Sequence, residues 1–223
     1  MKPLAPQQSL MEITVNRIRE AIISGELPLG SKLSEQKLAE TLGISRSPVH
    51  NALALLQYEG LVVVQPNVGS FVFTPSVKEA LDLCEHRAVL ETASLRLALD
   101  LNPDHLIDGL VASTSVMQEA ARNGDTVSYT KGDMSFHEHI VGCSGNSSMA
   151  RTYPHTIGPL MALRTHLFTN LNAHPHQSLA EHEALIDACR RGEVEDAVAI
   201  LKTHISHLIE MYQKTRNKVA AGH

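Results

Sequence analysis

The chain lacks tryptophan, and aromatic residues make up only 4% of its 223 residues. This scarcity argues against an aromatic-rich β-sandwich, and the 43% of hydrophobic residues is typical of a globular protein built from aliphatic helices. No uncharged run approaches the roughly 20 apolar residues of a membrane-spanning helix. The N-terminal stretch MKPLAPQQSLMEITVNRIRE also contains no apolar signal segment. We therefore expect neither export nor membrane insertion, and a cytoplasmic location.

Cysteines are few and show no pairing pattern. Cys84, Cys143 and Cys189 are far apart in the sequence, and none belongs to a Cys-x-x-Cys pair. This spacing favours buried thiols in a reducing compartment, with a redox role as the alternative. Histidine is abundant by contrast, with 13 residues, which suggests that imidazole has a chemical role in this chain.

The net charge of −5 argues against a protein that coats nucleic acid indiscriminately. The charge is unevenly distributed, because residues 1–74 carry six Lys and Arg against six Asp and Glu. All of the net negative charge therefore lies in residues 75–223. The N-terminal part can still present a local basic face.

Three helical segments precede a hairpin in the first 74 residues. Apolar spacing predicts helices over 9–24, 34–42 and 45–59, each followed by a glycine, with Ser34 capping the second. The segment GELPLGSKLS between the first two is interpreted as a turn. LVVVQ and SFVFT, which flank PNVG, are typical of a two-stranded hairpin. Helix, helix, helix, hairpin is the order of a winged helix-turn-helix domain.

Helical patterns continue from Pro75 to the end of the chain without a strand-like segment. Pro154 and Pro159 fall inside one predicted helix, which we expect to be kinked or split. The predicted helices are 76–100, 103–122, 125–142, 147–171, 177–191 and 193–216. The predicted fold class is therefore mainly α, with an N-terminal winged helix-turn-helix domain at 1–74 and a C-terminal antiparallel bundle of six to seven helices at 75–223.

The third predicted helix has the residues expected of a helix that enters the major groove of DNA. Arg46 can contact a guanine edge or a phosphate, Ser45 and Ser47 can reach phosphate, and His50 lies one turn further on the same face. Gln36, in the preceding helix, can also reach the DNA backbone or a base. The alternative is that Arg46 and the serines only cap and solvate a helix.

The run from GELPLG to VGSFV resembles the DNA-binding domain of the GntR superfamily. It shares Gly-x-Leu-x-x-Gly-x-x-Leu, Leu-Ala before the turn, Ser-Arg-x-Pro-Val, and Glu-Gly-Leu ahead of a glycine-tipped wing, over nearly all of residues 10–74. The resemblance implies that Arg46 and His50 contact operator DNA and that Gly69 lets the wing approach the minor groove. The family usually has Arg-Glu at His50-Asn51 and a basic residue at Asn67-Val68, so fewer phosphate contacts and a lower salt dependence are expected.

Four side chains in the second half have a spacing that suits a metal site. Asp133 and His137 are four residues apart and share one helix face, while His182 and His204 lie on two helices joined by a short turn. If those helices pack antiparallel, one carboxylate and three imidazoles meet inside the bundle. That set suits Zn²⁺, Ni²⁺ or another first-row divalent ion. For each histidine alone, a core or surface role is the simpler interpretation.

The joint pattern resembles the FCD ligand-binding domain of the FadR-type branch of the same superfamily. The chain has Asp-x-x-x-His, then Glu-His-x-x-Leu-x-x-Ala, Gly-Glu, and an alanine seven residues before His204. The resemblance implies that Asp133, His137, His182 and His204 are the metal ligands. Two nearby histidines are not included, because His139 lies about 200° around the helix from His137 and His207 is expected to be an outer neighbour.

The predicted helix at 76–100 contains Arg87 and Glu91, which resemble an Arg-x-x-x-Glu segment of the same family. An arginine buried near a metal can bind a carboxylate through two N–H groups, so we expect Arg87 and Glu91 to bind an acidic effector. The alternative is a surface ion pair between residues i and i+4. Arg164 is a weaker candidate for the same pocket.

These patterns together predict a metabolite-responsive regulator, a repressor in its simplest form, that binds double-stranded operator DNA and a small carboxylic acid. A homodimer is expected, because one winged helix buries too little surface for tight, specific binding. A metal sensor and a metal-dependent enzyme are the alternatives. Against an enzyme, the chain has no His-Glu-x-x-His, no Ser-His-Asp order and no glycine-rich phosphate loop.

Overall fold

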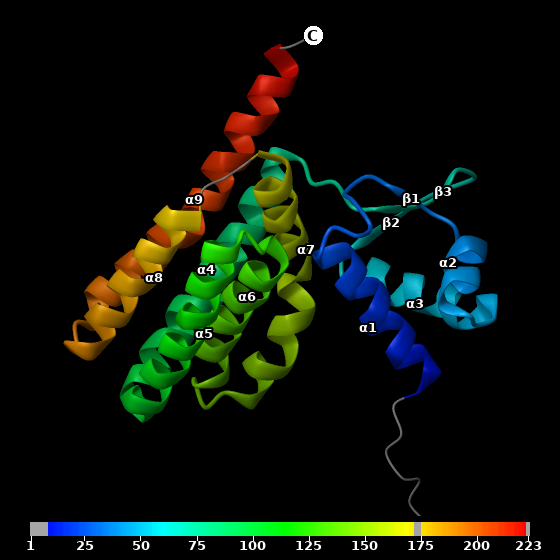
Figure 1. Cartoon of the computed structure of the whole chain (residues 1–223). Helices are drawn as coiled ribbons and strands as arrows, with labels where there is room; N and C mark the ends of the chain where they lie inside the picture. The colour runs from blue at the N-terminus through cyan, green and yellow to red at the C-terminus, as the bar shows by residue number, and fades with distance from the viewer. Residues whose placement is uncertain (1–8, 172–174, 222–223) are drawn as a thin grey trace, which may run out of the picture. The chain divides into compact units, whose positions relative to one another are not determined.

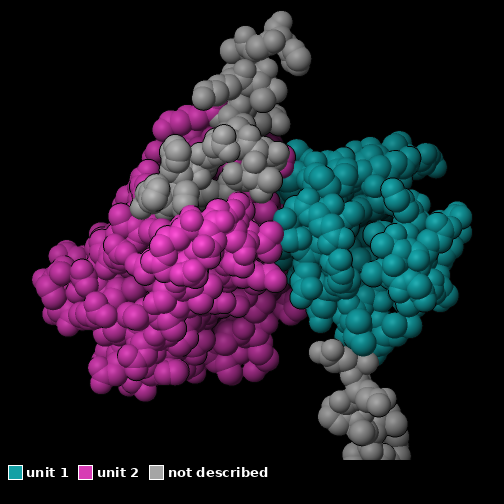
Figure 2. Space-filling view, in the orientation of Figure 1, with its two compact units in different colours: residues 1–74 teal, residues 75–223 magenta. Residues whose placement is uncertain are grey.

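Regular structure in the chain is mostly helical, which confirms the predicted fold class. The structure is a computed structural model that describes residues 9–171 and 175–221 (Figure 1). It divides into two compact units, residues 1–74 and 75–223 (Figure 2). Each unit has its own apolar core.

The first unit is a helix-turn-helix followed by a wing. Its elements are α1 (Leu10–Ile23), β1 (Lys32–Leu33), α2 (Glu35–Leu42), α3 (Arg46–Tyr58), β2 (Val62–Gln65) and β3 (Gly69–Val72). The side chain of Ser34 accepts a hydrogen bond from the Lys37 amide and begins α2. Gly43, with φ at 67°, ends α2 in the left-handed region, and α3 starts three residues later. This short turn joins α2 to α3, and the two helices pack against each other.

The predicted turn between α1 and α2 contains a strand that the sequence pattern did not reveal. β1 pairs antiparallel with β3, with Lys32 opposite Phe71, so the wing is a three-stranded sheet in the order β1-β3-β2. The prediction of a two-stranded hairpin was therefore incomplete. A strand of two residues has no period-2 pattern of its own, and only its pairing with β3 defines it.

The second unit consists of packed helices. They are α4 (Val77–Leu101), α5 (Pro103–Asn123), α6 (Thr126–Gly142), α7 (Ser147–Leu171), α8 (Pro175–Arg190) and α9 (Val194–Ala221). The side chains of Ser76, Asn102 and Asp125 accept amide hydrogen bonds at the starts of α4, α5 and α6. No helix among the described residues is long and apolar enough to cross a membrane.

Helix α7 continues through both of its prolines. The segment was expected to be kinked or split at Pro154 and Pro159, and of these two alternatives the split was wrong. Each proline removes an amide donor, but neighbouring Tyr153, Ile157 and Leu160 are buried, and α7 packs against α4 and α6. Tertiary packing therefore holds the helix together where its local sequence disfavours it.

The long helix α9 also contacts the residue at which the second unit begins. The hydroxyl of Tyr212 donates a hydrogen bond to the carbonyl oxygen of Pro75, and Tyr212 is buried. Helix α9 packs against α4 and α8. The start of the second unit is thus tied to its last helix.

Candidate metal centre and nucleic-acid interface

The start of α3 presents its polar residues to solvent. Ser45, Arg46, Ser47 and His50 are all exposed, whereas Val49 between them is fully buried. Ser45 occupies the N-cap position, yet its hydroxyl makes no capping hydrogen bond within the described residues. The exposed face can therefore contact another molecule without unfolding any part of the helix.

Glu35 of α2 holds two of these residues together, and the sequence analysis did not identify it. Its carboxylate oxygens lie 2.8 Å from Nδ1 of His50 and 3.5 Å from Nη2 of Arg46. The hydrogen bond with His50 lowers the pKa of Glu35 and outweighs the opposing effect of burial. Gln36 beside it is exposed and donates to Glu40 at 3.0 Å.

The wing places a lysine where the sequence suggested no basic residue. Gly69 has a φ of 133°, and a Cβ added to it would lie 3.1 Å from Cε of Lys32 on β1. The Lys32 ammonium group lies 5.9 Å from the centre of the Phe71 ring. Lys32 therefore supplies a positive charge beside the wing that Asn67 and Val68 do not supply. Its pairing with β3 could not be inferred without the missed strand.

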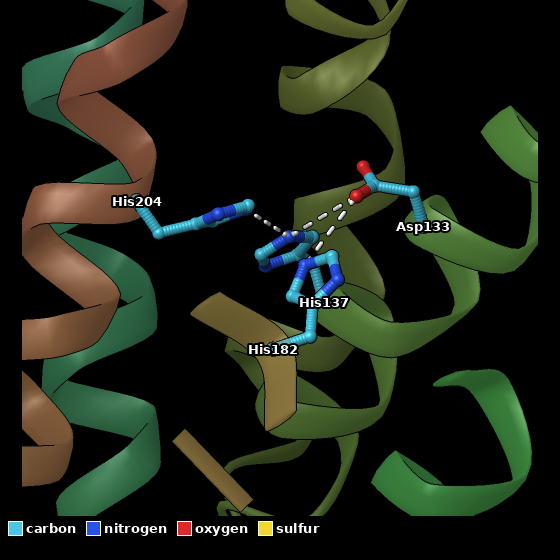
Figure 3. Close-up of side chains that lie close together, drawn as sticks. All are labelled: Asp133, His137, His182 and His204. Carbon is cyan, nitrogen blue, oxygen red and sulfur yellow. Dashed lines mark hydrogen bonds and ion pairs between the residues drawn. The ribbon is translucent and has the colours of Figure 1, made fainter. Parts of the chain in front are cut away.

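The second unit brings four predicted side chains to one point (Figure 3). Asp133 and His137 come from α6, His182 from α8 and His204 from α9, and one ligand atom of each lies within 4.8 Å of all the others. Nε2 of His204 is 3.2 Å from Nε2 of His137, and Nε2 of His182 is 3.5 Å from Oδ1 of Asp133. Nε2 of His137 is 3.9 Å from the same oxygen.

These distances fit a single metal ion. Donor atoms about 2.0–2.1 Å from a tetrahedral ion are roughly 3.3–3.5 Å from one another. The four residues are almost completely buried, and neither ring nitrogen of His182 has a hydrogen-bond partner among the described residues. A buried imidazole without a partner is costly, and a bound cation would satisfy it. The donor set of three imidazoles and one carboxylate therefore fits a divalent first-row ion.

Two carboxylates orient the imidazoles of His137 and His204 through contacts to Nδ1, the ring nitrogen opposite the proposed metal-binding Nε2. Glu91 lies 2.7 Å from Nδ1 of His137, and Glu181 lies 2.8 Å from Nδ1 of His204. Each contact favours the tautomer with hydrogen on Nδ1, which leaves Nε2 free to bind an ion. Glu181 was part of a motif that the sequence analysis identified, but no role was assigned to it.

The imidazoles are set to be uncharged at neutral pH. Burial and the charge of Arg87 lower the pKa of His137 to about 4. Burial and the neighbouring imidazole of His204 lower the pKa of His182 far below its usual value. Burial also lowers the pKa of His204, against the opposing hydrogen bond to Glu181. Neutral imidazole is the form that binds metals.

Arg87 and Glu91 are buried, so the alternative of a surface ion pair was wrong. Their exposed fractions are 1% and 0%, and Nε of Arg87 lies 2.5 Å from Oε1 of Glu91. Glu91 also accepts hydrogen bonds from His137 and from the hydroxyl of Tyr153, which the sequence analysis did not identify. Both terminal nitrogens of Arg87 are buried without a hydrogen-bond partner among the described residues.

Arg164 lies closer to the cluster than its weak sequence signal suggested. Its Nη2 atom is 2.7 Å from Oδ1 of Asp133 and 2.9 Å from the hydroxyl of Ser178. Burial raises the pKa of Asp133, but the charges of Arg164 and its other cationic neighbours outweigh burial and leave the pKa lowered. A small cavity lined in part by Arg164, Glu181 and His204 opens beside the cluster.

The two excluded histidines lie outside the four-residue cluster. His207 is 2.7 Å from Glu181 and about one-third exposed. His139 lies beside His105 and Cys143 instead. Cys84 and Cys189 are buried, and burial raises the pKa of each thiol to about 11. Cys143 is only partly buried, contrary to expectation, because it caps the end of α6.

Comparisons with known proteins agree with both units. Residues 82–207 match the FCD domain, and residues 10–72 match the bacterial regulatory proteins of the gntR family. An uncharacterised HTH-type transcriptional regulator in an unstable DNA locus of Streptomyces ambofaciens is 30% identical, over 90% of this chain and 84% of the relative. A probable D-xylose utilization operon transcriptional repressor of Paenarthrobacter nicotinovorans is 28% identical, over 91% and 90%.

A solved structure shares the fold. E. coli McbR/YncC superposes with a TM-score of 0.82 at 20% identity, covering 94% of this chain and all of that one. The FCD match alone spans more than half of the sequence. The chain therefore belongs to the GntR family of bacterial regulatory proteins, in the branch with an FCD domain, and it is a DNA-binding transcription regulator rather than an enzyme.

Proposed function

We propose that the protein is a homodimeric, cytoplasmic transcription repressor whose FCD domain binds a small carboxylic acid at a divalent metal ion. The observation that carries this proposal is the meeting of four metal-binding side chains with a buried arginine whose terminal nitrogens have no partner among the described residues. The relative from Paenarthrobacter nicotinovorans is named as a repressor, which supports the same direction of regulation here.

Asp133, His137, His182 and His204 would hold the ion, with Zn²⁺ or Ni²⁺ favoured by the nitrogen-rich donor set. When bound, the ion supplies a Lewis-acidic position to which a carboxylate oxygen can bind. Glu91 and Glu181 fix the ring orientations of His137 and His204, so these side chains need little rearrangement to bind it.

The buried charges favour an anionic effector. Two guanidinium groups, Arg87 and Arg164, are balanced inside the unit by two buried carboxylates, Asp133 and Glu91. A divalent ion adds two positive charges to this balanced set. A carboxylate bound at the ion offsets that charge and can accept hydrogen bonds from the terminal nitrogens of Arg87. A neutral metabolite would neither offset the charge of the ion nor supply a carboxylate to accept hydrogen bonds from Arg87.

Operator binding is assigned to the exposed face at the start of α3. Arg46 is proposed to contact a base edge. The phosphates would be contacted by Ser45, Ser47 and Gln36, and His50 would contact either a base or a phosphate. The wing would approach the minor groove at Gly69.

A homodimer is proposed because two such domains on a two-fold operator would bury the surface area that a single domain cannot. Exposed Val89, Leu97 and Leu101 on α4 offer apolar surface for a second subunit. Light scattering would test the dimer by its mass.

Effector response can be tested on the operator complex. An operator is selected from random duplex DNA, and its affinity for the full-length protein is measured by fluorescence anisotropy after chelation and dialysis. Zn²⁺ or Ni²⁺ is then added, followed by a panel of mono-, di- and hydroxycarboxylic acids. We expect one acid to weaken operator binding by about 5- to 150-fold, and only in the metal-loaded protein.

A matched pair of variants separates the acid from the metal. Arg87→Lys keeps the charge but loses the paired N–H geometry, whereas Arg96→Lys changes an arginine of the same helix that pairs with Glu195 at the surface. We expect Arg87→Lys to lose the acid response while metal binding remains, and Arg96→Lys to behave as the parent. A full response to metal alone would identify a metal sensor and contradict the acid proposal. Failure of every acid would also contradict it.

A further inference from the structure

Three side chains on the far side of α6 form a second cluster of metal-binding type. His139 and Cys143 are at the end of α6, and His105 is in the first turn of α5. One ligand atom of each lies within 4.8 Å of the others. We propose that His105, His139 and Cys143 bind a borderline-soft transition-metal ion such as Zn²⁺, at a site separate from the buried cluster. This inference does not depend on the proposed effector.

The geometry suits one ion held across two helices. Nε2 of His139 lies 3.3 Å from Sγ of Cys143, and the ring centres of His105 and His139 are 5.3 Å apart. His139 and Cys143 are four residues apart, so both face α5. Nε2 of His139 also lies 3.1 Å from the carbonyl oxygen of His105, which suits the tautomer with hydrogen on Nε2. The other tautomer leaves the Nε2 lone pair for an ion.

A glycine on α5 makes room for this arrangement. A Cβ added to Gly109 would lie 2.0 Å from Nε2 of His139 and less than 2.5 Å from two further ring atoms. Any other residue at 109 would therefore displace the imidazole from its place between the two helices. Glycine is unfavourable inside a helix, and α5 carries it where the ring of His139 lies.

The donor set selects the class of ion. A thiolate with two imidazoles suits Zn²⁺, and a water molecule can complete four-coordination because the site is near the surface. Burial raises the pKa of Cys143, so the free thiol is protonated. Binding forms the metal–sulfur bond and releases the thiol proton to solvent, without any change of oxidation state. Carbonyl groups at the C-terminal end of α6 also favour a cation there.

This site can be distinguished chemically from the buried cluster. Only the second site contains sulfur, since the buried cluster offers one carboxylate and three imidazoles. A thiolate bound to Co²⁺ produces a charge-transfer absorption band in the near ultraviolet, which oxygen and nitrogen ligands do not produce. Bound metal also protects a thiol from alkylation. Buried Cys84 and Cys189 serve as internal references within the same chain.

The test uses the reduced, full-length protein with Co²⁺ for the spectrum and Zn²⁺ for protection. Alkylation of each cysteine by iodoacetamide is followed by mass spectrometry. We expect Co²⁺ to produce the thiolate band and Zn²⁺ to slow alkylation of Cys143 by about tenfold or more, because a metal-bound thiolate is a weaker nucleophile. Alkylation of the buried references should not change.

Variants assign the effect to the three residues. Cys143→Ser should abolish the band, and His105→Ala, at an exposed position, should abolish protection without disturbing the fold. His86→Ala, an exposed histidine of α4, and His182→Ala, in the buried cluster, should retain both signals. Absence of the band and of protection in the parent protein would overturn the proposal. Protection that persists in His105→Ala would overturn the three-residue site.

Discussion

The two units use the same kinds of side chain in opposite surroundings. In the first, the side chains of Arg46 and His50 are 68% and 69% exposed. In the second, those of Arg87 and His137 are each 1% exposed. Exposed charges stay hydrated until a phosphate displaces water, whereas buried charges need partners within the protein. An altered surface residue should therefore affect binding alone, while an altered buried residue should affect folding as well.

The largest effect is expected from Glu91→Ala. It leaves Arg87 buried without its carboxylate, and breaking a buried ion pair typically costs about 3–5 kcal/mol. Denaturant unfolding of the metal-free protein would measure this loss. Glu195→Ala removes the partner of an exposed arginine and should change stability little. If both substitutions lowered the free energy of unfolding equally, the buried ion pair would contribute no more to stability than the exposed one.

Removal of a proposed metal ligand should affect binding more than folding. His182→Ala is expected to weaken Zn²⁺ affinity by at least about 100-fold, since even residues behind the ligands contribute about 10- to 100-fold. The metal-free protein should lose little stability through hydrogen bonding, because the ring nitrogens of His182 have no such partner among the described residues. Competition with a chromophoric chelator measures the affinity, and His86→Ala is the control. Unchanged affinity would exclude His182 as a ligand.

Arg46→Ala should weaken binding to the selected operator by about 10- to 100-fold, the value of a paired contact to a base. Thermal unfolding should not change, because the side chain is exposed. Mobility-shift titration measures the affinity. Arg46→Lys keeps the charge and should preserve binding to non-operator DNA, while operator preference falls. If Arg46→Ala bound the operator as tightly as the parent protein, the proposed contact of Arg46 with a base would be wrong.

The smallest effect is expected at the wing. Lys32→Ala should weaken operator and non-operator DNA alike and lower the salt slope of log affinity by about one, the contribution of one phosphate contact. Anisotropy titrations at several salt concentrations would measure the slope. Lys78→Ala, on α4, should leave it unchanged. A change in operator preference would instead indicate that Lys32 contacts a base.

Local features of the chain allowed much of the fold to be predicted. Ser34 was predicted to cap a helix, and its hydrogen bond spans only three residues of sequence, as do those of the caps Ser76 and Asn102. β1 escaped prediction because two residues have no pattern without their partner strand. The continuity of α7 escaped it because packing against other helices outweighs the two prolines.

Some residues of the candidate sites could be grouped from their sequence spacing, whereas others are brought together only by helix packing. Asp133 and His137 share a face at a spacing visible in the sequence, but His182 and His204 join them only through the packing of α8 and α9. The i,i+4 spacing of Arg87 and Glu91 is the same for a surface pair and a buried one, so the spacing alone did not decide between these two alternatives. The contact of Arg164 with Asp133, which joins two helices, could not be inferred.

Helix α9 carries the proposed metal ligand His204, and through Tyr212 it is also hydrogen-bonded to Pro75. His204 and Tyr212 are eight residues apart on the same helix, about 12 Å along its axis. A helix of this kind moves as a stiff rod over such a length. A displacement of His204 along the helix axis would carry Tyr212, and its hydrogen bond to the carbonyl of Pro75, with it. Helix α9 therefore connects His204, a proposed metal ligand, with Pro75, the residue at which the second unit begins.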